Sequence, residues 1–245
     1  MVLLRQIRLL LLAELRQEVR SFEVVLTSAF FSVVMMALFA LSLGALPVES
    51  QLMAVPGALW LSVAFVGSLT LTRVFDRERE SDTLRALLVG PVNRMAIYFS
   101  KAAVALLVLL LATAVLVPGL IVIFPGAAPM AERPLFSAAM VLLGCVGYVA
   151  VGTLFAAGLA AGSGKNVLLS LILHPLTTPV LMFNLVATRA LLEAHPGADA
   201  YLGRLAAVDV VLVVLGAWLF EPVLVGGGGG GAAAAAGRRA RGAGR

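Results

Sequence analysis

The stretch AAVALLVLLLATAVLVPGLIVIF, residues 102–124, contains no charged side chain and is long enough to cross a bilayer as a helix. A hydrocarbon core about 30 Å thick requires about 20 apolar residues in helical form. Continuous apolar runs favour helices over the strands of a membrane barrel, in which apolar and polar residues alternate. Five further stretches reach the required length: residues 22–46, 52–72, 135–161, 167–192 and 205–225. The sequence therefore predicts an all-α integral membrane protein with six transmembrane helices.

The composition of the chain excludes an ordinary soluble protein. Hydrophobic residues make up 61% of the 245 residues and charged residues 13%, with a mean hydropathy of +1.05. Soluble domains contain about a quarter charged residues. The single cysteine, Cys145, excludes a disulfide framework within the chain and a multi-cysteine zinc site. The net charge is +5, and the charged residues lie mainly between the apolar runs and in the two tails. This distribution argues against nucleic acid as a partner.

The distribution of basic residues predicts the orientation in the bilayer. Fifteen of the 18 Lys and Arg residues fall in the N-terminal segment, in residues 73–101, in the 162–166 turn and in the C-terminal tail. The other three are Arg133, Arg189 and Arg204. Lys and Arg concentrate in cytoplasmic segments of membrane proteins. Both termini are therefore expected in the cytoplasm.

The two ends of the chain differ from the apolar runs. Residues 1–21 combine leucines with Arg5, Arg8, Arg16 and Arg20, which predicts an amphipathic helix lying at the membrane interface. A solvated cytoplasmic helix is the alternative. Residues 226–245 consist mainly of glycine, alanine and arginine, so we expect a disordered tail that is weakly attracted to anionic lipid.

The sequence lacks the residues of a catalytic or metal centre. The string Gly-Ser-Gly-Lys-Asn at 162–166 does not form a P-loop, because Leu159 replaces the required glycine and Asn166 replaces the Ser or Thr. His174 is a candidate intramembrane polar residue, although a histidine bonded to a neighbouring carbonyl is equally consistent with the pattern. Asp209 and Glu221 lie near the ends of the last predicted span and are expected to mark the interface.

Residues 73–101 form the longest charged segment between two spans. Ser81 or Asp82 can cap a short helix that places leucines on one face, and Gly90-Pro91 would end it. Such a helix can dock into the groove of a cytosolic partner. It can equally lie on the membrane surface, and the spacing alone does not decide between the two.

Small residues and prolines mark the fourth and fifth predicted spans. Gly158 and Gly162 form a G-x-x-x-G pair on the helix that also carries Gly144, Gly147 and Gly152. Small residues allow helix backbones to approach closely within lipid. Pro175 and Pro179 are expected to bend the fifth span. The pattern predicts a multi-helix bundle rather than a set of independent spans.

The charged segment resembles the corresponding loop of ABC-2 type transporter permeases. Its pattern is Asp-Arg-Glu-Arg-Glu-x-x-Thr-Leu-x-x-Leu-Leu-x-x-Pro-Val-x-Arg, residues 76–94, followed by Lys101. Residues 142–161, LLGCVGYVAVGTLFAAGLAA, and the Leu/Pro-rich run to Leu181 are similar to the haem exporter protein B (CcmB) family of cytochrome c maturation. The similarity covers about residues 1–225. It implies that eight residues couple the chain to an ATPase: Glu78, Glu80, Ser81, Thr83, Leu84, Leu87, Leu88 and Pro91.

The resemblance also implies partners and a mechanism. It implies a permease homodimer in the bacterial inner membrane, bound to a cytosolic CcmA-like ATPase, to CcmC-like and CcmD-like membrane proteins and to a CcmE-like haem chaperone. ATP would be hydrolysed by the partner, no cofactor would bind this chain directly, and haem is a candidate cargo of the complex. Trp60 and Trp218 are isolated and the chain has no paired axial ligands, which favours a mechanical role over haem binding.

Two other functions remain open from the sequence. An ABC-2 permease that exports lipid, polysaccharide or a drug would share the span layout and the charged loop. A membrane scaffold that anchors a cytosolic protein without transport would share them as well. A membrane enzyme is disfavoured, because no set of catalytic residues converges in the sequence.

Overall fold

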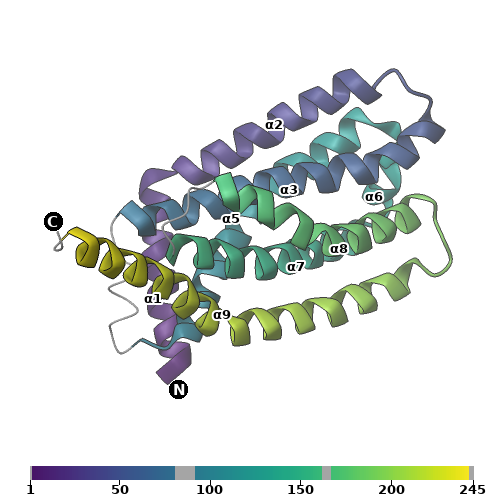
Figure 1. Ribbon diagram of the computed structural model, residues 1–245. Helices are drawn as coiled ribbons and strands as arrows, with labels where there is room; N and C mark the ends of the chain where they lie inside the picture. The colour runs from purple at the N-terminus through teal and green to yellow at the C-terminus, as the bar shows by residue number, and fades with distance from the viewer. Residues whose placement is uncertain (1, 81–91, 162–166, 243–245) are drawn as a thin grey trace.

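The computed structural model describes residues 2–80, 92–161 and 167–242, and every regular element in these ranges is a helix (Figure 1). The prediction of an all-α protein is confirmed for this part of the chain. The helices are α1 (Val2–Ser21), α2 (Glu23–Leu43), α3 (Val48–Glu80), α5 (Arg94–Ile123), the 3-10 turn η1 (Pro125–Ala127), α6 (Ala128–Glu132), α7 (Pro134–Ala161), α8 (Val167–Leu192) and α9 (Ala198–Gly242).

Within the described residues, five helices are long and apolar enough to cross a membrane. Their spanning parts are Glu23–Leu43, Val48–Phe75, Arg94–Ile123, Pro134–Gly158 and Ala198–Leu224. Thr177–Leu192, in the second half of α8, is a shorter apolar helix. The chain is therefore a multi-pass membrane protein, and the sixth span over residues 167–192 stays a prediction.

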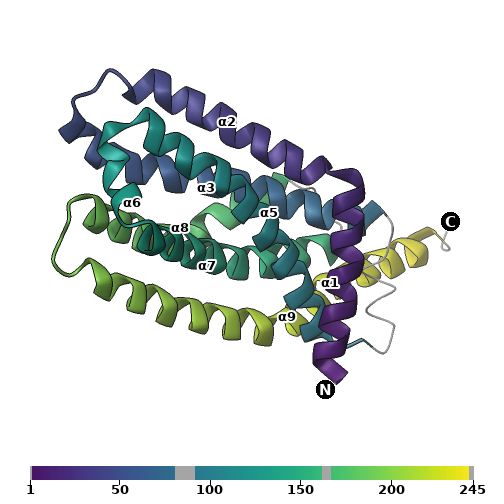
Figure 2. The same ribbon diagram turned by 180° about the vertical axis from the view of Figure 1, so that it is seen from behind.

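One end of the bundle gathers the segments that the sequence assigns to the cytoplasm. The N-terminus, the last turns of α3, the first turns of α5 and the C-terminal end of α9 lie at this end (Figures 1 and 2). The α2–α3 turn, α6 and the α8–α9 turn lie at the other end. Helix α1 crosses the first end at a steep angle to the long helices, as a helix in the plane of the interface would; its interfacial position stays a prediction.

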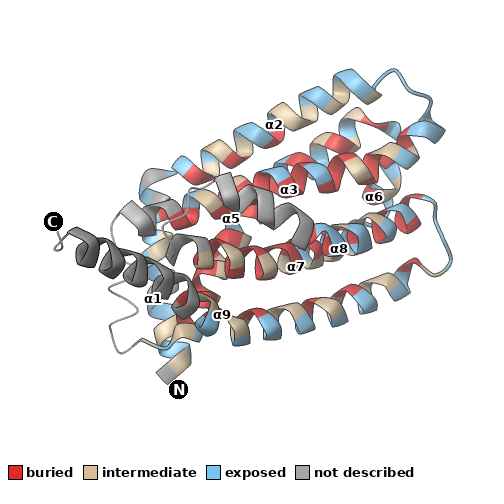
Figure 3. Ribbon diagram, viewed as in Figure 1, coloured by how far each residue is buried: buried red, intermediate tan, exposed pale blue. Residues whose placement is uncertain are grey.

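The core lies around α3 and α7. In an apolar stretch of 18 residues within each of these helices, 61% of the residues are buried inside the protein. The corresponding share is 17% in α2 and 28% in α9 (Figure 3). The largest fully buried side chains include Trp60 of α3, Tyr148 of α7 and Tyr98 of α5. The outward faces of the long helices remain apolar, as expected for surfaces in contact with lipid.

The helices extend beyond two predicted boundaries. Residues 73–101 were expected to form a loop between two spans, whereas residues 73–80 continue α3 and residues 94–101 begin α5. Arg and Glu, which alternate at 77–80, are good helix formers. The last helix continues through Gly242, although residues 226–245 were expected to be disordered. The five alanines at 232–236 have the highest helix propensity, which favours this continuation.

Candidate functional site

The predicted coupling site lies at the end of the bundle that α1 crosses. Glu78 and Glu80 belong to the last turn of α3, but their side chains are not among those described. The six other predicted coupling residues lie outside the described part of the chain: Ser81, Thr83, Leu84, Leu87, Leu88 and Pro91. The structure therefore shows the helices on either side of the coupling segment, and their contacts define the site.

A buried ion pair joins α1 to α5. The amine of Lys101 contacts Oε1 of Glu14, and their side chains are 2% and 19% exposed. Glu14 and Glu18 share the inward face of α1 with Leu10, Leu11 and Leu15, which pack partly against the core. These positions recur at spacings of three and four residues, as one face of a helix requires. A charge at this depth is stable only when paired, so the pair fixes α1 against α5.

The start of α5 makes a second contact with α1. Oδ1 of Asn93 caps α5 by accepting a hydrogen bond from the backbone N–H of Met95 at 2.9 Å. The backbone N–H of Asn93 donates to Oε1 of Gln6 in α1 at 3.2 Å. The point where the chain returns from the coupling segment is therefore held by α1.

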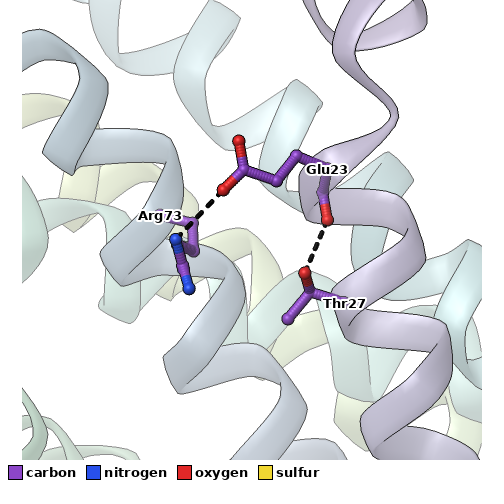
Figure 4. Close-up of polar contacts among 3 residues, drawn as sticks. All are labelled: Glu23, Thr27 and Arg73. Carbon is purple, nitrogen blue, oxygen red and sulfur yellow. Dashed lines mark hydrogen bonds and ion pairs between the residues drawn. The ribbon is translucent and has the colours of Figure 1, made fainter.

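Two exposed ion pairs extend these contacts to α2, α3 and α9. Arg73 of α3 donates to Oε1 of Glu23 at 3.2 Å, and the hydroxyl of Thr27 donates to the carbonyl of Glu23 at 2.7 Å (Figure 4). Arg94 at the start of α5 pairs with Glu221 of α9. Together with the α1 contacts, these pairs join α5 to α1 and α9, and α2 to α3, at one end of the bundle. A displacement of the start of α5 would therefore act on α1 and α9, and the described residues of this end include no group placed for covalent chemistry.

The predicted packing residues are only partly described. A Cβ at Gly158 would lie 2.5 Å from Cγ1 of Val223, so this glycine permits the close approach of α7 and α9. Gly162 lies outside the described residues. Pro175 and Pro179 both fall within α8, where Pro179 is exposed. The side chains of Pro175 and His174 are not described, so the bend and the role of His174 stay predictions.

Polar contacts between the central helices were not predicted from the sequence. Nε1 of Trp60 in α3 donates to the hydroxyl of Thr188 in α8 at 2.7 Å. The hydroxyl of Tyr148 in α7 donates to the carbonyl of Ala64 in α3 at 2.8 Å. Single aromatic and hydroxyl residues in apolar runs carry no spacing signal, which is why sequence reasoning missed them.

The glycines of α7 accommodate these neighbours. A Cβ at Gly144 would lie 2.0 Å from Cη2 of Trp60, and one at Gly147 would lie 2.4 Å from Oδ1 of Asp209. A side chain at either position would force a neighbouring side chain to move. The sequence predicted close packing along this helix, and the structure identifies α3, α8 and α9 as the helices that approach it.

The expectation that Asp209 marks the interface is wrong. Its side chain is 5% exposed and packs against α7, because α9 begins as early as Ala198. The buried oxygens without a hydrogen-bond partner among the described residues include Oδ2 of Asp209, Oδ1 of Asn184 and Oγ1 of Thr153. Glu221, by contrast, is exposed and pairs with Arg94. No group of three or more His, Cys, Asp or Glu side chains in the described ranges could hold a metal ion.

Residues 5–224 match the model of the CcmB protein family, which spans nearly the whole helical bundle. The chain belongs to the CcmB protein family. The resemblance stated from the sequence is thereby confirmed. Membership of the CcmB family makes the chain a membrane component of the haem-export and cytochrome c maturation system, and a transporter component. The match ends at residue 224, immediately before the glycine and alanine tail. No curated protein matches the sequence.

Proposed function

We propose that this chain is the permease subunit of an ABC complex for cytochrome c maturation and couples a separate cytosolic ATPase to the membrane. The family match over residues 5–224 carries the proposal. The permease has six spans in the bacterial inner membrane with both termini in the cytoplasm. Helix α8, at 26 residues, is long enough to supply the sixth span.

Force from the ATPase enters between α3 and α5. Closure of two ATPase copies on ATP pushes the segment around residues 81–91, which joins the two helices. The Lys101–Glu14 pair and the Asn93–Gln6 hydrogen bond then carry the displacement to α1, and the Arg94–Glu221 pair carries it to α9. These contacts are the physical support for a mechanical role, because they join the start of α5 to both α1 and α9.

Haem is handled by the partners of this chain rather than bound within it. The apolar cavity between α5, α7 and α9 has a volume of about 190 Å³ and is lined by residues such as Ala102, Val146 and Val213. Ligand pockets usually measure about 300–1,000 Å³. The permease acts as a homodimer with CcmA-like, CcmC-like and CcmD-like subunits, and ATP turnover releases the haem-loaded CcmE-like chaperone on the outer face.

The deciding experiment measures holo-cytochrome c in cells that lack this protein and in cells whose partner ATPase is inactive. Loss of c-type haem attachment in both strains is the expected result. Normal cytochromes in both would contradict the proposal and favour an ABC-2 permease for lipid, polysaccharide or drugs. Loss in the first strain alone would favour a scaffold that does not require ATP turnover.

The coupling residues are tested separately. Replacing both Leu84 and Leu87 with Asp should abolish co-purification of the ATPase, because charged side chains would have to enter the apolar groove of the partner. Leu135→Asp, at a side chain 86% exposed at the opposite end of the bundle, is the control and should retain the ATPase. Retained ATPase in the double variant would refute the docking assignment.

A further inference from the structure

The fold separates the charges of α1 by sign. The helix contains four arginines and two glutamates, mixed along the sequence. Glu14 and Glu18 face the bundle, where Glu14 pairs with Lys101 and the side chain of Glu18 is buried. Arg5, Arg8, Arg16 and Arg20 are all exposed. The outward face of α1 is therefore cationic, although the sequence of the helix is mixed.

Two of the arginines line an open cavity beside α1. The cavity has a volume of about 540 Å³, and its described lining residues are Leu12, Leu15, Arg16 and Arg20. Arg16 and Arg20 are four residues apart, so they lie on the same side of the helix. Neither guanidinium forms an ion pair within the described part of the chain. The nearby Glu23 is paired with Arg73 and does not neutralise them.

We propose that this cavity is a binding site for one anionic phospholipid. Guanidinium groups bind phosphate oxygens through paired, charge-assisted hydrogen bonds, so Arg16 and Arg20 hold the headgroup phosphate. Leu12, which is 42% exposed, and Leu15 contact the glycerol and the upper acyl chains. Free phosphate would leave these leucines exposed to water, whereas a lipid covers them.

The position of the cavity supports a lipid as the occupant. Helix α1 crosses the end of the bundle where α2 and α5 begin, which is the level of the headgroups of one leaflet (Figure 2). Phe22, the residue between α1 and α2, is 57% exposed at this level. A lipid bound to α1 would keep the helix against the membrane while its inner face is held by Lys101. The site depends only on the membrane location and is independent of the proposed function.

The test is native mass spectrometry of the full-length protein in detergent, titrated with palmitoyl-oleoyl phosphatidylglycerol or phosphatidylcholine. We expect the wild type to retain one phosphatidylglycerol in preference to phosphatidylcholine. The variant R16Q/R20Q should bind phosphatidylglycerol about thirtyfold more weakly, since two basic residues are removed and each contributes about 1 kcal/mol at a membrane surface. The single variant Arg20→Gln should show an intermediate loss.

The matched control is R5Q/R8Q, which removes the same charge from the same helix outside the cavity. It should change phosphatidylglycerol binding by less than about twofold. Equal losses of phosphatidylglycerol binding in the two double variants would show that the lipid is attracted by the charge of α1 in general, which would overturn the site. A wild type that binds phosphatidylglycerol and phosphatidylcholine equally well would also overturn it. Displacement of phosphatidylglycerol by millimolar inorganic phosphate would also overturn it, because the occupant would then be free phosphate. Melting curves of all variants confirm that they are folded.

Discussion

Helices α7 and α2 are both strongly apolar, yet α7 lies at the centre of the bundle and α2 at its edge. In α7, 61% of the residues in an apolar stretch of 18 residues are buried inside the protein, whereas in α2 the share is 17%. Helix α7 contains glycines at 144, 147, 152 and 158, and α2 contains none. Three residues of α2 are buried, Val24, Ser28 and Ser32, which form one narrow stripe. Apolarity thus places both helices in the membrane, and small residues decide which of them is central.

The physical reason is that lipid provides no hydrophobic drive for helices to associate. Packing must come from close van der Waals contact and from hydrogen bonds between helices. Gly144 and Gly147 make room for Trp60 and Asp209 from two different helices. Helix α2 offers a single hydroxyl contact, Ser28 to Thr70 at 3.1 Å. The following four predictions test this difference, from the largest expected effect to the smallest.

Helix α1 is a third case, since it is peripheral like α2 but held by a buried ion pair. We expect Lys101→Ala to lower the free energy of unfolding by about 3–5 kcal/mol, because Glu14 would lose its ion pair with the buried Lys101. Denaturation of the purified protein in detergent measures the change. The exchanged pair K101E/E14K should recover part of the loss. No recovery would mean that packing of the lysine stem, rather than the ion pair, holds α1.

Gly144→Ala tests the central position of α7. The added Cβ would lie 2.0 Å from Trp60 and 2.6 Å from Oδ1 of Asn184. Overpacking of this kind costs about 1–3 kcal/mol. Gly57→Ala is the control, because its Cβ would meet no described atom within 4 Å and the change should stabilise α3 by up to about 1 kcal/mol. Equal melting temperatures for the two variants would contradict the proposed role of glycine in α7.

Thr188→Val removes a hydrogen bond between central helices. Nε1 of Trp60 would lose its acceptor in the core, which costs about 1–3 kcal/mol for a buried polar group. Thr27→Val in α2 is the matched control, since its hydroxyl bonds only to a carbonyl of its own helix. We expect thermal unfolding to show a lower melting temperature for Thr188→Val and an unchanged one for Thr27→Val. A similar loss for Thr27→Val would mean that hydroxyl removal, and not the inter-helix contact, is being measured.

Arg73→Gln is expected to have the smallest effect. The Arg73 and Glu23 side chains are 50% and 59% exposed, and such pairs contribute about 0.2–1 kcal/mol. Salt should reduce the difference in melting temperature between wild type and variant, because exposed charges are screened. A loss of stability as large as that of Lys101→Ala, and unchanged at high salt, would contradict this expectation. It would show that the Arg73–Glu23 pair holds this end of α2 as firmly as the Lys101–Glu14 pair holds α1.

Sequence reasoning was most accurate where a long, continuous signal exists. The apolar runs predicted helices close to α2, α7 and α8, and the family resemblance was confirmed over residues 5–224. It was least accurate at helix ends. The charged residues after Arg73 could not be divided into helix and loop by composition, because arginine and glutamate suit both.

The candidate site was predicted only in part. The charges of the sequence pointed to the end of the bundle that α1 crosses, and both the coupling role of this end and the coupling residues stay predictions. Sequence reasoning gave no indication that Lys101 would meet Glu14, because the two residues belong to different helices 87 positions apart in the chain. It also misplaced Asp209, since the start of α9 determines the depth of that residue.

The sequence by itself determined that the chain enters the membrane as helices, which family it belongs to, and which segments carry charge. These properties depend on local composition and length, and each residue contributes without reference to a distant partner. The tertiary structure decided which helices are central, which carboxylates turn inward, and that the arginines of α1 remain free to face outward. These depend on contacts between helices far apart in the sequence, where a single glycine or a single buried ion pair decides which surfaces can meet.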